Sequence, residues 1–186
     1  MSAAINKHVV QARTAGTKYL VVGAVLVGFL ATLGAVIKTT SISSATAPNA
    51  ASLIQPIVAL VVLTGIVWVM MIAYRNVAIL RGAVSERYFR SYTEGAPAEW
   101  VERPTRAYMN LLELPVLFYV VCLLMLATGR FDAVQVSLAW LFILIRYAHA
   151  IIHIGFNHVP LRFAAFASGA ITLGVLWARF ALLNLQ

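Results

Sequence analysis

Long apolar runs separated by short polar segments dominate the hydrophobic pattern of this chain. Five runs reach or approach the roughly 20 residues that a helix needs to cross a bilayer, at about residues 19–37, 57–74, 111–128, 134–154 and 163–183. The second run can continue as a helix to Leu80. A membrane strand needs only about 10 residues and alternates in polarity, unlike these runs. The pattern therefore predicts an all-α integral membrane protein.

The composition supports the membrane class. Hydrophobic residues make up 62% of the chain and charged residues 11%, whereas soluble domains are about 45–50% apolar and about 25% charged. A soluble domain and a disordered chain are both excluded on this basis. The single cysteine, Cys122, lies inside an apolar run and is expected to be a small buried hydrophobe.

The basic residues predict an orientation. The formal charge is +8, and basic loops usually face the cytoplasm. We therefore expect the N-terminus, the arginine-rich connection 75–110 and the loop 155–161 on the cytoplasmic side of a membrane, with a bacterial inner membrane as the expected location. The basic residues are divided among several loops, which argues against nucleic-acid binding.

The first apolar run has two interpretations. A basic tail, an apolar stretch and the sequence Ser-Ala-Thr-Ala are compatible with a cleaved signal peptide. The run of about 19 residues is longer than the roughly 7–15 of a signal peptide, so an uncleaved span is the favoured interpretation.

Polar side chains are energetically costly inside a bilayer, so each one indicates a structural or functional role. Arg106, Asn110 and Glu113 are spaced by four and three residues, which places them on one helical face near the start of the third run, just before Pro115. Solvated charges at a helix end are the plainer interpretation of this face.

The fourth run carries Arg146, His149 and His153, again on one helical face. Such a stripe should point into the bundle or a wet cavity rather than into lipid. The two histidines at i and i+4 also suit a metal, but no acidic or thiol ligand accompanies them on that helix.

Arg162 opens the fifth run, at about the depth of Arg146. Two arginines there repel each other unless an anion or Glu113 lies between them. If Glu113 pairs with one, a net positive pocket remains that would attract a carboxylate, a phosphate or a thiolate. A thiolate stabilised in this way could attack a lipophilic electrophile arriving from the bilayer.

Two motifs resemble those of the MAPEG family, the membrane-associated proteins of eicosanoid and glutathione metabolism. Arg106-Ala-Tyr-Met-Asn110-Leu-Leu-Glu113-Leu-Pro115 is similar to the family's R-A-x-x-N-x-x-E-x-x-P, with the proline one position early. Arg146-Tyr-Ala-His149-Ala-Ile-Ile-His153 is similar to R-x-x-H-x-x-x-Y, and Arg162 follows nine residues later, as in the microsomal glutathione transferase and prostaglandin E synthase branches.

The resemblance implies a four-helix bundle over about residues 55–186 that assembles as a homotrimer and binds glutathione between subunits near the cytosolic face. Residues 1–54 would then form a separate basic tail, an extra transmembrane helix and an uncharged linker. The resemblance further implies that Arg162 stabilises the thiolate, and that a second set of residues binds glutathione: Arg106, Asn110, Glu113, Arg146, His149, His153 and, lent by a neighbouring subunit, Arg75.

The chain departs from the family pattern at two positions. His153 stands where the family usually has tyrosine, and Phe163 stands where some members have serine. A histidine can still donate a hydrogen bond, but its charge varies near neutral pH. These departures bear on the activity more than on the fold.

Three functions are compatible with these features. The first is a thiol transferase or peroxidase that uses glutathione, or another thiol, and a lipophilic electrophile. The second is a non-catalytic, MAPEG-like scaffold or accessory subunit of a larger membrane complex, which the extra helix and His153 favour. The third is a lipid, quinone, metal or haem site.

Overall fold

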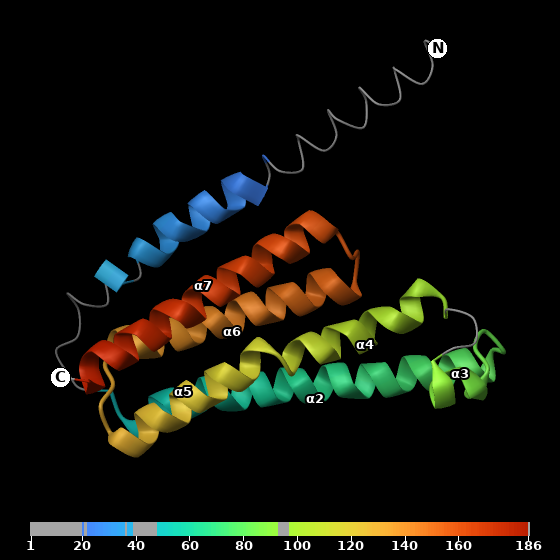
Figure 1. Ribbon diagram of the computed structural model, residues 1–186, viewed down its shortest axis with the longest axis horizontal. Coiled ribbons are helices and arrows are strands. Elements are labelled where there is room, and N and C mark those ends of the chain that lie inside the picture. Colours follow the sequence, from blue (N-terminus) through green and yellow to red (C-terminus); the bar gives the residue numbers. More distant parts are fainter. Residues whose placement is uncertain (1–19, 21, 36, 39–47, 93–96, 186) are drawn as a thin grey trace, which may run out of the picture.

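The protein is a bundle of long helices (Figure 1). The computed structural model describes residues 20, 22–35, 37–38, 48–92 and 97–185. Over these residues it contains no strand. The principal helices are α2 (Ala50–Leu80), α3 (Glu86–Ser91), α4 (Glu99–Leu111), α5 (Leu114–Thr128), α6 (Ala133–Ile154) and α7 (Val159–Asn184).

Four helical segments are long and apolar enough to cross a bilayer. They are α2, α4 together with α5, α6, and α7. At a rise of about 1.5 Å per residue, each exceeds the roughly 30 Å of a hydrocarbon core. The predicted all-α membrane bundle is therefore confirmed, and the extension of the second span to Leu80 is confirmed with it.

The first apolar run contributes a shorter helix, Val22–Ala35, which is drawn in blue in Figure 1. Its Leu33 is buried in the main hydrophobic core, and Phe29 packs against the same core. This helix therefore docks on its own bundle. The basic tail and the Ser-Ala-Thr-Ala sequence lie outside the described residues, and the division at residue 54 remains a prediction because no observation tests it.

Helices α6 and α7 form the antiparallel pair that supports one half of the bundle. Asp132 caps α6: its side chain accepts from the backbone N–H of Gln135, and the Gln135 side chain accepts from the backbone of Asp132. Stacked Phe118 and Phe142, with ring centroids 4.8 Å apart, join α5 to α6. The predicted burial of Cys122 is confirmed in this core.

The third span is interrupted between α4 and α5. Proline lacks a backbone N–H and its ring clashes with the carbonyl four residues earlier, so Pro115 prevents the ladder from continuing through Leu111. Leu112 and Glu113 lie between the two helices, with Glu113 at φ −94° and ψ −99°. The break leaves carbonyl groups of the last turn of α4 without partners from within the helix.

Candidate functional site

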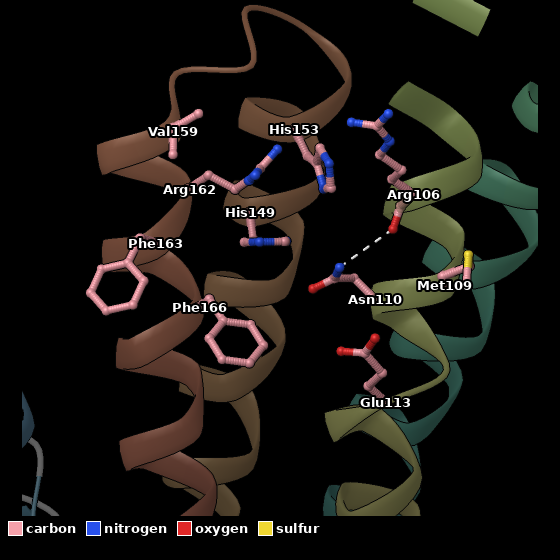
Figure 2. A pocket seen from close by; sticks show the side chains of 10 residues that line it. All are labelled: Arg106, Met109, Asn110, Glu113, His149, His153, Val159, Arg162, Phe163 and Phe166. Atoms are coloured by element: carbon pink, nitrogen blue, oxygen red, sulfur yellow. Dashed lines mark hydrogen bonds between the residues drawn. The ribbon is translucent and has the colours of Figure 1, made fainter. Parts of the chain in front are cut away.

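A cleft of about 510 Å³ lies between the α4–α5 break and the α6–α7 pair. Figure 2 shows residues from α4 and from the α4–α5 link along one wall, and residues from α6 and α7 along the other. The volume falls in the range of about 300–1,000 Å³ that is typical of small-molecule sites. The lining consists of Arg106, Met109, Asn110, Glu113, His149, His153, Val159, Arg162, Phe163 and Phe166.

The α4–α5 wall carries one of the predicted polar triads. Arg106 and Asn110 project from α4, and the Asn110 side chain donates to the Arg106 carbonyl at 3.4 Å. Glu113 lies beyond the end of α4 but still lines the cleft. The three residues therefore share one cleft although the helix that was expected to align them is broken.

The opposite wall carries two histidines and an arginine. His149 and His153 lie on successive turns of α6 with their rings edge to face and 5.6 Å between centroids. Both are buried, and the Nδ1 atom of His153 is among the buried polar atoms without a hydrogen-bond partner. Arg162 extends from the first turn of α7 across the same wall (Figure 2).

Apolar side chains complete the cleft. Phe166 lies one turn beyond Arg162 on α7, and its ring is 6.3 Å from that of His149. Met109, Val159 and Phe163 contribute further apolar surface, and all three are exposed. The cleft thus combines charged groups with a surface suited to a hydrophobic ligand.

Arg146 lies beside this cleft without lining it. Its side chain is fully buried, and its Nη2 donates to the Asn110 carbonyl at 2.7 Å. That carbonyl belongs to the last turn of α4, so Arg146 supplies a donor where the helix break removed one. Its Nε and Nη1 atoms have no hydrogen-bond partner among the described residues.

The charge of the cleft is predominantly positive. Arg106 and Arg162 line it, and Glu113 is its one acidic lining residue. The nearest acidic partner of Arg106 is Glu102, at 4.0 Å and outside the lining. Over the described part of the chain, Glu113 makes no ion pair within 4.0 Å with Arg146 or Arg162, and its carboxylate acts on the Arg146 guanidinium at longer range.

Arg75 lies away from the cleft. Its Nη2 donates to Thr105 Oγ1 at 3.3 Å, and its guanidinium stands 5.3 Å from the centre of the Phe89 ring. These contacts join α2 to α4 and α3, so within one chain Arg75 is a packing residue. Its role toward a neighbouring subunit remains a prediction.

Six of the eight predicted site residues therefore line one cleft, and Arg146 and Arg75 do not. Sequence reasoning missed Asn157, which accepts a hydrogen bond from Arg162, and Glu99, which accepts one from Asn157. Glu99 and Asn157 are 58 positions apart, so no helical or strand spacing signals their contact, whereas Asn157 precedes Arg162 by only five positions.

The described residues hold no group of three or more His, Cys, Asp and Glu side chains placed to bind a metal ion. A second, apolar groove of about 280 Å³ lies between α2 and α6. Its lining contains Tyr147, whose hydroxyl donates to the Ala59 carbonyl at 2.8 Å. The groove carries no charged side chain in its lining.

Comparison with known proteins gives one match. The model of the MAPEG family matches residues 53–182, which is more than two thirds of the chain and includes every residue of the cleft. No curated protein and no solved structure matches the chain. The two motifs, the four membrane-spanning segments and the family match agree, and the chain belongs to the MAPEG family.

Proposed function

We propose that this protein is a membrane-bound thiol transferase that binds glutathione, or another small anionic thiol, and joins its sulfur to a lipophilic electrophile. The observation that carries the proposal is the charge of the cleft: Arg106 and Arg162 face it across from each other, with Glu113 as its one acidic lining residue. Membership of the MAPEG family agrees with glutathione as the thiol.

The cleft residues divide into two roles under this proposal. Arg106 and the imidazole of His149 bind the carboxylates and peptide groups of glutathione, while Asn110 and Glu113 hold its amino end. His153 offers a buried Nδ1 atom that needs a partner. Arg162 stabilises the thiolate, because a nearby cation favours the charged form of a thiol.

The apolar lining suits the second substrate. Phe163 and Phe166 lie next to Arg162 on α7, so a lipophilic molecule against them would be close to the sulfur. The thiol releases its proton to water, the thiolate forms a carbon–sulfur bond, and the leaving group departs with the electron pair of the bond that breaks. With a peroxide, the thiolate would attack one oxygen, the O–O bond would break with the alcohol as leaving group, and the resulting sulfenic acid would react with a second glutathione to give the disulfide and water.

The proposal includes a homotrimer in an inner bacterial membrane. The end of the bundle that carries the α6–α7 loop, residues 155–158, is called the Gly155 end and faces the cytoplasm. Arg75 reaches the cleft of a neighbouring subunit. Family membership and the basic residues near this end support these points. Further membrane subunits are compatible with the exposed apolar groove between α2 and α6.

A scaffold or accessory subunit is the second candidate, and His153 favours it because the family usually has tyrosine there. The docking of Leu33 in the chain's own core weakens one argument for it, since the extra helix does not need a partner to bury that residue. Binding of glutathione distinguishes the two functions.

The test is calorimetric titration of glutathione into the detergent-purified full-length protein, with Arg162→Ala beside it. Binding by the wild type that is lost in Arg162→Ala supports the proposal. Absence of binding by correctly assembled wild-type protein overturns it for glutathione and favours the accessory subunit.

A further inference from the structure

A chain of three side chains fixes the direction of Arg162. Its Nη1 atom donates to Asn157 Oδ1 at 2.7 Å, and Asn157 Nδ2 donates to Glu99 Oε1, also at 2.7 Å. Glu99 is the first residue of α4, Asn157 lies in the loop after α6, and Arg162 lies in the first turn of α7. The chain therefore links the two walls of the cleft.

A second contact holds the same loop. Arg103 donates to the Gly155 carbonyl at 2.7 Å and to Glu99 Oε1 at 3.1 Å. A side chain at Gly155 would place a Cβ atom 2.8 Å from the Ile151 carbonyl oxygen, so glycine suits this close turn. The start of α4 thus binds both the backbone and a side chain of the α6–α7 loop.

Asparagine suits position 157 for two separate reasons. The backbone there has φ +47°, in the left-handed region that asparagine tolerates better than most residues. Its amide also accepts and donates at once, which lets it receive the Arg162 N–H while giving one to Glu99. Glycine would keep the backbone and lose both hydrogen bonds.

The amide is also neutral. A carboxylate in the same place would hold the guanidinium but cancel its charge, whereas an amide oxygen directs it and leaves the charge free to act on an anion. The Glu99 carboxylate accepts a hydrogen bond from the Asn157 amide and influences Arg162 through that amide.

We infer that Asn157, held by Glu99, is a positioning residue that directs the Arg162 guanidinium into the cleft and thereby keeps a bound thiol in its thiolate form. The inference rests on the proposed function for its chemistry and on the hydrogen-bond chain for its geometry. The other charged or titratable groups facing the cleft are Arg106 and Glu113 from the α4–α5 wall and His149 and His153 from α6.

The first experiment compares Asn157→Gly with the wild type by calorimetry and by the ultraviolet absorbance of bound glutathione thiolate across a pH series. We expect glutathione affinity to fall about three- to tenfold, the loss of about one hydrogen bond to a charged group at a partly solvated site. The apparent pKa of the bound thiol should rise, because a misdirected cation stabilises the thiolate less.

Asn76→Ala is the matched control. Asn76 is exposed on α2 and its side chain donates within its own helix, to the Ile72 carbonyl at 3.0 Å. It should leave affinity and pH profile unchanged. Glu99→Gln retains an acceptor for Asn157 and should produce a smaller change than Glu99→Ala, whereas equal effects of the two would contradict the ordering role of the acceptor.

A second readout does not require glutathione. Phenylglyoxal modifies accessible arginines, and mass spectrometry of the peptide containing Arg162 gives the rate. Faster modification in Asn157→Gly than in wild type supports the inference, whereas an unchanged rate overturns it. If wild-type protein fails to bind glutathione, the proposed function falls and this rate still decides whether Asn157 holds Arg162. If glutathione binds and Asn157→Gly shows the wild-type pH profile, only the positioning role falls.

Discussion

The two arginines of α7 illustrate two different uses of the same side chain. Arg179, near the end of the helix, makes a two-point ion pair with Asp132, with Nε 2.9 Å and Nη2 2.5 Å from Oδ2. Arg162, near the start, has an amide as its hydrogen-bond partner, the side chain of Asn157. Both partners come from the residues that precede a helix, Asp132 before α6 and Asn157 before α7.

The difference lies in the charge that remains. A bidentate carboxylate neutralises the guanidinium and ties α6 to α7, so the charge of Arg179 is paired at the end of the bundle where Asp132 lies. A neutral amide orients the guanidinium without cancelling it, so the Gly155 end retains a positive charge beside an open cleft. The charge of the hydrogen-bond partner therefore distinguishes Arg179, which is paired and structural, from Arg162, which keeps its charge for an anion.

The largest expected effect separates the two arginines by activity. Arg162→Ala should lower the rate of thiol transfer to a lipophilic electrophile about 100-fold, the scale of removing one group that stabilises a developing or bound anion. Arg179→Ala should change the rate less than about twofold. Steady-state kinetics of both variants test this, and equal losses in the two would break the comparison.

The second-largest effect is expected when the amide partner of Arg162 is replaced by a carboxylate, the kind of partner that Arg179 has. Asn157→Asp should retain the contact with Arg162 but neutralise it, and glutathione affinity should fall about tenfold. Since the new carboxylate would also face Glu99, the double variant Asn157→Asp, Glu99→Gln serves as the control. Calorimetry showing wild-type affinity in the double variant would mean that the charge of Arg162 is not what the ligand uses.

Replacing the carboxylate partner of Arg179 by an amide should lower the stability of the fold and leave glutathione binding unchanged. Asp132→Asn keeps a side-chain oxygen for the N-cap of α6 and loses the ion pair with Arg179. We expect the free energy of unfolding to fall by about 1 kcal/mol, as for a partly exposed ion pair. Thermal or detergent unfolding measures this change, and glutathione affinity should stay as in the wild type.

The smallest effect is that of salt. Raising the ionic strength from about 0.1 M to about 1 M shortens the screening length from about 10 Å to about 3 Å. Glutathione affinity should weaken about two- to threefold, because an unpaired cation in an open cleft is screened. The unfolding temperature should change little, and salt-independent binding would argue against an electrostatic site.

The spans could be predicted because hydrophobic length is a local property. The run predicted at 134–154 is α6, Ala133–Ile154, and the membrane-spanning class follows from the apolar runs alone. Helical spacing likewise predicted that His149 and His153 share a face. These inferences needed no knowledge of what lies beside each helix.

The break in the third span was harder to predict. Pro115 was visible in the sequence, yet a proline near a helix start is compatible with an unbroken helix. Arg146 was expected in the cleft because it shares the stripe of the two histidines. It is instead buried against the Asn110 carbonyl, since the break created an unpaired acceptor there.

The amino-acid sequence by itself determined the membrane class, the approximate spans, the family motifs and the two polar stripes, because hydropathy and helical periodicity are properties of one continuous segment. Tertiary structure alone decided that Arg179 meets a carboxylate and that Glu99 holds Asn157, whereas the contact between Arg162 and Asn157 spans only five positions. Asp132 meets Arg179 across 47 positions and Glu99 meets Asn157 across 58. Contacts at such separations depend on how the helices pack, and they determine where the bundle retains an unneutralised charge.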